Sequence, residues 1–355
     1  MSEPTNAYAA AGVDIEAGDR AVELMKAHVA RTRRPEVLGG LGGFAGFFDA
    51  SAFTRFEHPV LATSTDGVGT KVAIAQAMDR HDTIGFDLIG MLVDDLVVVG
   101  AEPLFVTDYI ATGKVVPERI AAIVSGIAAA CEVAGAALLG GETAEHPGLL
   151  EPDEYDMAGA TTGVVERAAI LGPERVRPGD VVIGLASSGL HSNGYSLVRH
   201  VLLDQAGWSL DRDVPELGAT LGETLLTPTR VYARDILALI ETAPVHSISH
   251  ITGGGLANNL VRVLPAGVRA TLRRASWTPA PIFSLVQGLG GVSQADIEAT
   301  LNMGVGMALV VPAASVDALM TEATARGLLP WLLGEITAQE AAEAPAVVEL
   351  VGQHR

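Results

Sequence analysis

The sequence contains a single cysteine, Cys131, in 355 residues. An intramolecular disulfide is therefore impossible, which is typical of a protein that works in the reducing cytoplasm. Aromatic residues make up only 5% of the chain, so aliphatic side chains must pack most of its interior. The longest uncharged apolar stretch contains Pro312 and is about a dozen residues long, whereas a membrane-spanning helix needs roughly 20. We expect neither a membrane segment nor a signal peptide.

Basic residues are also scarce. The chain has 23 lysines and arginines against 42 aspartates and glutamates, which gives a net charge of −19. Such a surface repels a polyanionic backbone, so we expect no nucleic-acid partner. A small phosphorylated ligand is compatible with this charge, because glycine-rich loops and a bound cation can hold an anion locally.

The abundant residue types indicate two α/β domains. Hydrophobic residues make up 49% of the chain, and its 40 glycines favour many tight turns. The length exceeds that of one ordinary core, and a turn-rich connector with Pro173 and Pro178 predicts a boundary between domains 1–167 and 168–355. Apolar patterns in the first domain predict strands at 59–65, 104–112, 136–145 and 155–166 and helices at 84–99 and 117–134. In the second, Thr227 and Pro228 predict the start of a helix that runs to residue 241.

The stretch "STDGVGTK" (64–71) ends the first predicted strand. It lacks the G-x-x-x-x-G-K spacing of a P-loop, so that motif is excluded. Its glycines nevertheless expose backbone N–H groups, Thr70 and Lys71 can donate to phosphate oxygens, and Asp66 can hold Mg²⁺. An ordinary turn with an Asp-Gly corner is the alternative. The glycine-rich "GGLGGFAG" (39–46) has no strand before it, which excludes a Rossmann dinucleotide site; a flap over a ligand and a flexible linker both fit.

Several acids lie inside or beside apolar segments. Asp94 and Asp95 lie near the C-terminal end of the predicted helix 84–99, where the helix dipole is unfavourable to a carboxylate. Burying an unpaired carboxylate is costly, so this placement favours a bound cation over a capping role. Glu142 follows two glycines at the end of another predicted strand. Together with Asp66, these separate acids could converge on a Mg²⁺ ion that bridges the phosphates of a nucleotide.

Two loops of the second domain could receive a second anion. The first, "SSGLHSNG" (187–194), offers hydroxyl, imidazole and amide groups before a predicted helix. The second, "HITGGG" (250–255), offers Thr252 and three glycines. Free N–H groups at helix N-termini bind phosphate, although an ordinary cap and a tight turn explain either loop taken alone. Seen with the acids of the first domain, they indicate a second, phosphorylated substrate.

These segments together resemble one family. The sequence is similar to the phosphoribosylformylglycinamidine cyclo-ligases, also called aminoimidazole ribonucleotide synthetases, over about residues 8 to 335. Seven motifs in chain order carry the resemblance: "STDGVGTK" (64–71), "DLVVVGAEP" (95–103), "GGETAEHPG" (140–148), "SSGLHSNGYSLVR" (187–199), "TPTRVY" (227–232), "HITGGG" (250–255) and "NMGVGM" (302–307).

The resemblance implies an ATP-dependent ring closure in purine biosynthesis. ATP would phosphorylate the formyl oxygen of formylglycinamidine ribonucleotide, the amidine nitrogen would attack that carbon, and phosphate would leave. The implied fold has two α/β domains of this superfamily, in a homodimer whose N-terminal sheets form a shared barrel. ATP and Mg²⁺ are the implied cofactors, and the ATP site would lie near the subunit interface.

The resemblance also implies roles for individual residues. Mg²⁺ would be bound by Asp66, Asp95 and Glu142, and the catalytic residues would be Asp66, Asp95 and His191. Contacts with the nucleotide are implied for Lys26, Gly40, Gly42, Gly43, Gly67, Gly69, Thr70 and Lys71. Contacts with the phosphorylated substrate are implied for Ser188, Asn193, His250, Thr252, Gly253 and Gly254.

Other interpretations are less consistent with the sequence. A selenophosphate synthetase needs a reactive cysteine or selenocysteine near the N-terminus, and this sequence has none there. A hydrogenase-maturation dehydratase would lack "SSGLHSNGYSLVR" followed by "TPTRVY". A thiamine-phosphate kinase usually departs from "TDGVGTK". An inactive nucleotide-binding paralogue is the alternative from a different class, but such a subunit has no reason to keep these acids. Asp94, Val99 and Leu301 stand where many relatives carry Asn, Gln and Phe.

Overall fold

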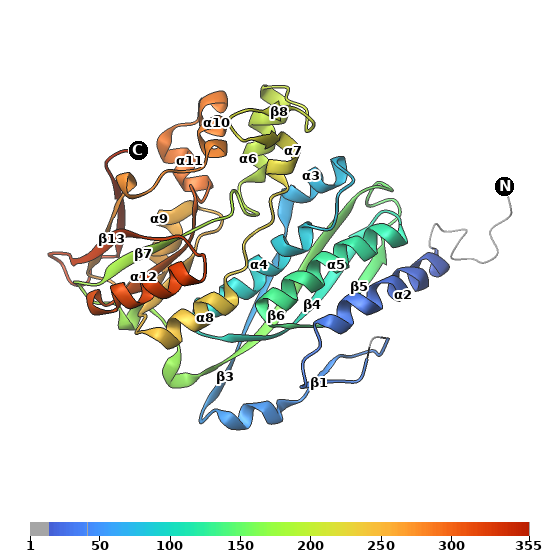
Figure 1. The fold of residues 1–355 in the computed structure, drawn as a ribbon, viewed down its shortest axis with the longest axis horizontal. Helices are drawn as coiled ribbons and strands as arrows, with labels where there is room; N and C mark the ends of the chain where they lie inside the picture. Colours follow the sequence, from blue (N-terminus) through green and yellow to red (C-terminus); the bar gives the residue numbers. More distant parts are fainter. Residues whose placement is uncertain (1–13, 41, 355) are drawn as a thin grey trace.

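The chain forms two sheets with their helices in the computed structural model, which describes residues 14–40 and 42–354 (Figure 1). The first six residues of the resemblance to the family, 8–13, therefore lie outside the described part. The N-terminal sheet has the strand order β3–β6–β4–β5. Its strands are β3 (Pro59–Gly67), β4 (Glu102–Thr112), β5 (Ala137–Glu145) and β6 (Tyr155–Glu166). Strands β4 and β5 are parallel, and the other neighbours are antiparallel.

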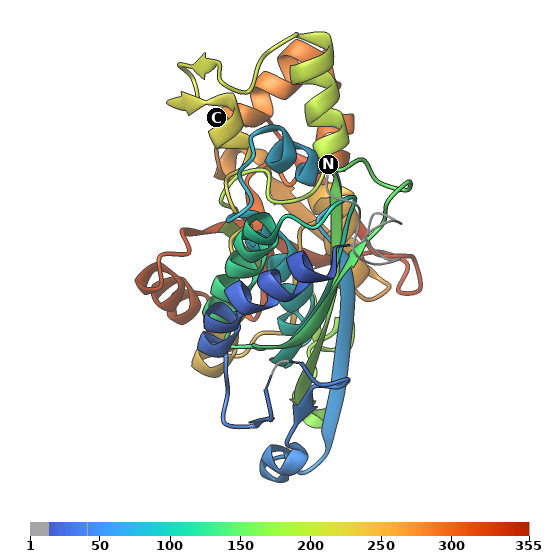
Figure 2. The same cartoon turned by 90° about the vertical axis from the view of Figure 1, so that its right-hand side faces the viewer.

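Helices cover one face of this sheet. They are α4 (Ile84–Val97) and α5 (Pro117–Ala134), with α2 (Ile15–Arg31) packed against α5. Helix α5 has Pro117 in its first turn and ends at Gly135, whose left-handed φ of 79° suits a helix end. A Cβ on Gly159 of β6 would lie 2.7 Å from Leu92, so this glycine lets α4 lie close against the sheet. Figure 2, which shows the sheet nearly edge-on, places these helices on one side of it.

The other face of the N-terminal sheet is only partly covered: Phe48 of β2 (Phe47–Phe48) packs against Phe105 with 5.4 Å between ring centroids, whereas other large side chains on this face stay exposed. Exposed and half-buried residues alternate along most of β3, as expected for a strand with one face packed and one face open. The open face carries large apolar side chains: Leu61 is 59% exposed and Tyr109 is 39% exposed. Both β3 and β5 are edge strands, so their outer backbone groups are also available for pairing.

The second sheet has six strands in the order β10–β12–β7–β13–β11–β14. They are β7 (Val181–Ala186), β10 (Ser247–His250), β11 (Val268–Arg273), β12 (Val305–Val311), β13 (Pro330–Ala338) and β14 (Val347–Val351). Its helices include α6 (Tyr195–Arg199), α8 (Ala233–Thr242), α9 (Gly255–Leu260), α10 (Pro281–Gly290), α11 (Gln294–Thr300) and α12 (Val316–Ala325). We propose the domain boundary at residues 167 and 168, between β6 and β7.

Short elements complete the described part. They are α3 (Val72–Ala77), α7 (Leu221–Leu225), a π-helical turn (His200–Gln205), and the two-stranded ribbons β1 (Val37–Leu38) with β2 (Phe47–Phe48) and β8 (Asp213–Val214) with β9 (Ala219–Thr220). No helix in the described residues combines the length and the apolar character needed to cross a membrane.

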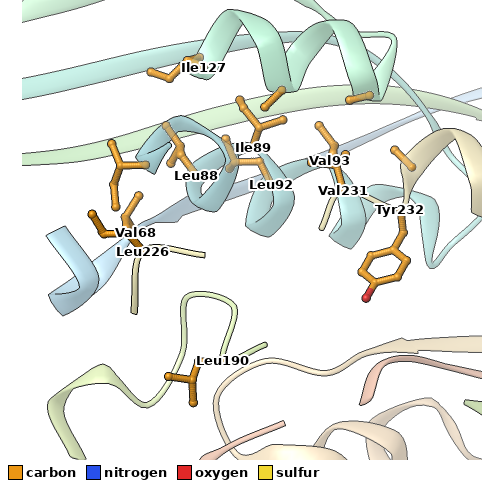
Figure 3. Close-up of a cluster of buried hydrophobic side chains, with 14 of the residues drawn as sticks. Val68, Leu88, Ile89, Leu92, Val93, Ile127, Leu190, Leu226, Val231 and Tyr232 are labelled. Carbon is orange, nitrogen blue, oxygen red and sulfur yellow. The ribbon is translucent and has the colours of Figure 1, made fainter. Parts of the chain in front are cut away.

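The helix predicted from Thr227 begins later than expected. Residues 226–232 form an irregular segment and α8 starts only at Ala233. In Figure 3, side chains of this segment lie beside Leu92 and Val93 of α4. Its backbone groups bond to side chains of the other domain, as described below, and these bonds replace those of the predicted first helical turns.

Candidate active site

Two predicted catalytic acids meet a loop of the second domain at the junction between the domains. Oδ1 of Asp95, on α4, lies 3.0 Å from Nδ1 of His250, at the end of β10. Asp66, at the end of β3, lies close enough to Asp95 and His250 for their charges to change its pKa. Burial raises the pKa of Asp66 and the Asp95 carboxylate raises it further, whereas a hydrogen bond from the Gly67 N–H and the nearby His250 oppose this rise. Three segments far apart in sequence therefore bring their polar groups to one place.

The two loops of the second domain adjoin each other at the same junction. Oδ1 of Asn193 lies 3.3 Å from the position that a Cβ on Gly253 would take. The Asn193 amide also donates to the sulfur of Met91 on α4 at 3.3 Å. Asn259 holds the glycine turn 252–255 by donating to three of its carbonyl oxygens. The structure thus groups the loop residues that were predicted to bind the phosphorylated substrate.

Ser188 and His191 use their polar groups mainly within the protein. The Ser188 hydroxyl donates to the carbonyl of Pro228 at 2.7 Å. His191 is 1% exposed, and its Nε2 accepts the backbone N–H of Ser188 at 3.1 Å, which assigns the ring proton to Nδ1. Burial lowers the pKa of His191 well below its usual range, so the imidazole is neutral. Its approach to the reacting centre stays a prediction.

Lys71 lies buried between the domains, so its predicted contact with the triphosphate is wrong. The side chain is 0% exposed. Its Nζ donates to Oδ1 of Asp87 at 2.6 Å and to the carbonyl oxygens of Thr227 at 2.6 Å and His191 at 3.0 Å. These three acceptors use all three N–H groups of the ammonium. Lys71 instead connects the first domain to two loops of the second.

Asp87 and Asp94 complete this connection. Oδ1 of Asp87 also accepts the Thr229 N–H at 3.1 Å and the Thr229 hydroxyl at 2.6 Å. The Asp94 oxygens accept the Tyr232 N–H at 3.0 and 3.2 Å, at the N-terminus of α8. Burial raises the pKa of Asp94 well above its usual range, and these N–H donors oppose the rise. The prediction that Asp94 binds a cation is therefore not supported, because its carboxyl instead caps the N-terminus of a helix in the other domain.

Replacing Asp94 should lower the stability of the protein more when the new side chain has no acceptor for the Tyr232 N–H. We expect Asp94→Ala to lower the free energy of unfolding by about 1–3 kcal/mol, because it leaves the buried N–H of Tyr232 without a partner. Asp94→Asn keeps an acceptor oxygen at the same place and should cost clearly less. Urea unfolding of both variants measures the difference. Equal losses in the two variants would show that packing, rather than the hydrogen bond, decides the effect.

The remaining residues of "STDGVGTK" (64–71) lie toward the second domain. Gly69 is exposed with a left-handed φ of 73°, and the Thr70 hydroxyl lies 3.2 Å from the hydroxyl of Ser196. Asp66 and Asp95 each keep one carboxylate oxygen without a hydrogen-bond partner in the described residues. Two exposed carboxylates with a free oxygen each are a donor set that suits Mg²⁺, which takes its other ligands from phosphate and water.

Glu142 does not join these two acids within one chain. Asp66 is in register with Gly159, Asp108 and Gly141 on the next three strands. Three inter-strand spacings of about 4.8 Å separate it from β5 by about 14 Å, and Glu142, the residue after Gly141, points to the opposite face. In the described residues no group of three His, Cys, Asp or Glu side chains could hold a metal ion. The predicted three-acid cluster is therefore wrong for a single chain, because two strands lie between its members.

Glu142 instead borders a pocket with the glycine-rich loop. This pocket has a volume of about 460 Å³ and lies between α2, α5 and strands β4 and β5. Gly42 and Gly43 line it, while Lys26 and Gly40 line an adjoining hollow. Asp108 on β4 is a further acid in the pocket, which the sequence analysis did not identify. Its position at the end of the apolar run "LFVTD" was the available signal.

Comparisons with known proteins identify the family. A model of the "AIR synthase related protein, N-terminal domain" matches residues 48–165, and one of the C-terminal domain matches residues 177–345. A curated phosphoribosylformylglycinamidine cyclo-ligase from Shouchella clausii is 52% identical over 95% of this chain and 97% of its own length. One from Brevibacillus brevis is also 52% identical, over 96% of this chain and 97% of its own.

Solved structures with a similar fold are more distant in sequence. Thiamine-monophosphate kinase from Stenotrophomonas maltophilia superimposes with a TM-score of 0.69 at 22% identity, covering 94% of this chain and 96% of its own. The hydrogenase maturation protein HypE in complex with ATP gives 0.64 at 20% identity, covering 96% and 93%. At these identities the likeness shows the fold alone.

Proposed function

The chain belongs to the phosphoribosylformylglycinamidine cyclo-ligase family, and from this premise we propose how its residues carry out the ATP-dependent ring closure of purine biosynthesis. The γ-phosphoryl group passes from ATP to the formyl oxygen of the substrate, and ADP leaves. The amidine nitrogen then attacks the formyl carbon, the bond from that carbon to the phosphorylated oxygen breaks, and inorganic phosphate and a proton are released. The single observation that carries the assignment of the site is the meeting of Asp66, Asp95 and His250 between the domains.

The two acids provide the nucleotide side of this site. We propose that Asp66 and Asp95 hold Mg²⁺ through their free carboxylate oxygens, which would supply positive charge beside the phosphates. His250 donates its Nδ1–H to Asp95 and thereby fixes the direction of that carboxylate. The backbone N–H of Gly69 and the Thr70 hydroxyl are the donors that we propose for phosphate oxygens, whereas the Gly67 N–H donates to Oδ1 of Asp66 at 2.7 Å.

The loops of the second domain provide the substrate side. We propose that the 5′-phosphate of the substrate lies at Thr252, Gly253 and Gly254, where Asn259 fixes the turn by donating to its carbonyl oxygens. Ser188 and Asn193 lie on the neighbouring loop and face the same substrate. This arrangement puts the transferred phosphoryl group between the two domains, where closure of the domains excludes water.

We also propose that the chain forms a homodimer through the open face of the N-terminal sheet. The exposed Leu61 and Tyr109 lie on this face, and apolar side chains on an uncovered sheet favour burial against a second copy. If two four-stranded sheets close into one barrel, β5 of one subunit lies beside β3 of the other. The strand end that carries Glu142 would then lie beside the strand end that carries Asp66 of the partner subunit, and we propose that each site is completed across the interface. A cytoplasmic location is proposed on the basis of the single cysteine.

The activity is tested by following product formation. Purified protein with ATP, Mg²⁺ and formylglycinamidine ribonucleotide should form aminoimidazole ribonucleotide, ADP and phosphate in equal amounts. Omitting ATP should abolish the product, and chelating the divalent ions should abolish it reversibly. Folded protein that forms no product with all components present contradicts the proposed activity; ATP hydrolysis without ring closure favours a different enzyme of the superfamily.

A further inference from the structure

The pocket beside the glycine-rich loop has mostly apolar walls. Its volume of about 460 Å³ falls in the range of about 300–1,000 Å³ that is common for small-molecule sites. Helix α2 contributes one wall, and α5 and β5 contribute the others. The apolar lining consists of Ala21, Val22, Met25, Val29, Phe44, Val115, Val124 and Leu138. Such walls suit the faces of a flat ring system.

One acid interrupts this apolar lining. Asp108 lies between Val106 and Ile110 on β4, and because these two are fully buried, all three point toward the helices. Its carboxyl lies directly over Gly141: a Cβ on that residue would be 1.5 Å from Oδ1 of Asp108. Only a glycine at position 141 leaves room for the carboxyl in this orientation, so the backbone of β5 is shaped to accommodate it.

The carboxyl of Asp108 is partnered only by its own backbone N–H among the described residues, because no hydrogen bond or ion pair from another residue reaches it. The titratable groups near it are Glu142 at the rim of the pocket and the thiol of Cys131 on α5. Lys26 faces the adjoining hollow and pairs with Glu23. Burial raises the pKa of Asp108 to about 7. A buried carboxyl with a single backbone donor can accept further hydrogen bonds, and a bound ligand can supply one.

We propose that Asp108 determines the base specificity of the nucleotide site by accepting a hydrogen bond from the 6-amino group of adenine. This inference rests on the proposed function, which brings ATP to the glycine-rich loop. With the base between α2 and β5, the ribose and phosphates leave the pocket past Gly141 and Glu142, toward the subunit interface. A base with an oxygen at position 6, as in inosine, places an acceptor against the carboxyl and is disfavoured.

The test compares three triphosphates that differ at position 6 of the purine. Equilibrium binding of ATP, ITP and purine riboside triphosphate, which has no substituent there, is measured for the native protein and two variants. The native protein should bind ATP about tenfold more tightly than purine riboside triphosphate, the effect of one hydrogen bond. Asp108→Leu should bind these two equally. Asp108→Asn should still bind ATP and should also bind ITP, because its amide can present either the oxygen or the nitrogen to the base.

A matched control and the possible outcomes separate this inference from the proposed function. Val22→Ala, on the α2 wall, should change binding of all three nucleotides by the same factor. If the native protein binds ATP more tightly than the analogue and Asp108→Leu preserves that preference, Asp108 does not contact the base. If the native protein binds no purine triphosphate, the proposed nucleotide site itself is wrong.

Discussion

Two inactive variants should restore activity to each other when they are combined in one dimer. We expect Asp95→Asn and Glu142→Gln each to lower kcat by about 10²–10³-fold, because each removes a charge beside the transferring phosphoryl group. If Glu142 of one subunit completes the site of the other, a heterodimer of the two variants has both defects in one site and none in the second. Such a heterodimer should therefore have about half of the activity of the native dimer.

The experiment uses two affinity tags so that only mixed dimers are assayed. The two chains are co-expressed, and consecutive purification on both tags isolates the heterodimer. The matched control combines Asp95→Asn with Asp66→Asn, which lie on the same side of the interface, and it should stay inactive. An inactive Asp95/Glu142 heterodimer contradicts the shared site, as does a protein that sediments as a monomer at assay concentration.

The distance between Asp66 and Glu142 illustrates what could not be predicted from the sequence. The strand ends that carry these acids were predicted, because apolar runs followed by glycines are local signals. Their separation depends on the strand order β3–β6–β4–β5, which places the last strand of the domain in its middle. Strand order is set by long-range pairing, and the sequence pattern of an individual strand does not encode it.

The family, the α/β fold and the ATP-dependent ligase activity were predicted from ordered motifs, and the relatives confirm them. The residues whose roles could not be predicted are buried polar side chains that form the contact between the domains. Asp94 was predicted to bind a cation because the dipole of its own helix is unfavourable to a carboxylate. Its actual partner is the N–H of Tyr232 at the start of α8, which is 138 residues away in the chain. The same contact explains why α8 starts late, since the segment before it donates its N–H groups to Asp87 and Asp94.

Removing the ammonium of Lys71 should destabilise the protein rather than only weaken nucleotide binding. Lys71 and Asp87 are both fully buried and in contact at 2.6 Å. We expect Lys71→Met to lower the free energy of unfolding by about 3–5 kcal/mol, because it leaves the Asp87 carboxylate and two carbonyl oxygens buried without their donor. The double variant Lys71→Met/Asp87→Asn should recover part of this loss, since Asn keeps an acceptor for Thr229 and carries no charge.

An exposed lysine supplies the matched control for this prediction. Lys26 pairs with Glu23 at the surface, and Lys26→Met should change stability by less than about 0.5 kcal/mol. Chemical unfolding of the native protein, Lys71→Met, Asp87→Asn and the double variant gives the coupling between Lys71 and Asp87 as a double-mutant cycle, with Lys26→Met as the control. A Lys71→Met protein that unfolds like the native one but has lost its affinity for ATP would reverse the conclusion, because it would place the ammonium at the phosphates. With the expected result, the lysine of "TDGVGTK" acts on catalysis only through the domain contact that shapes the site.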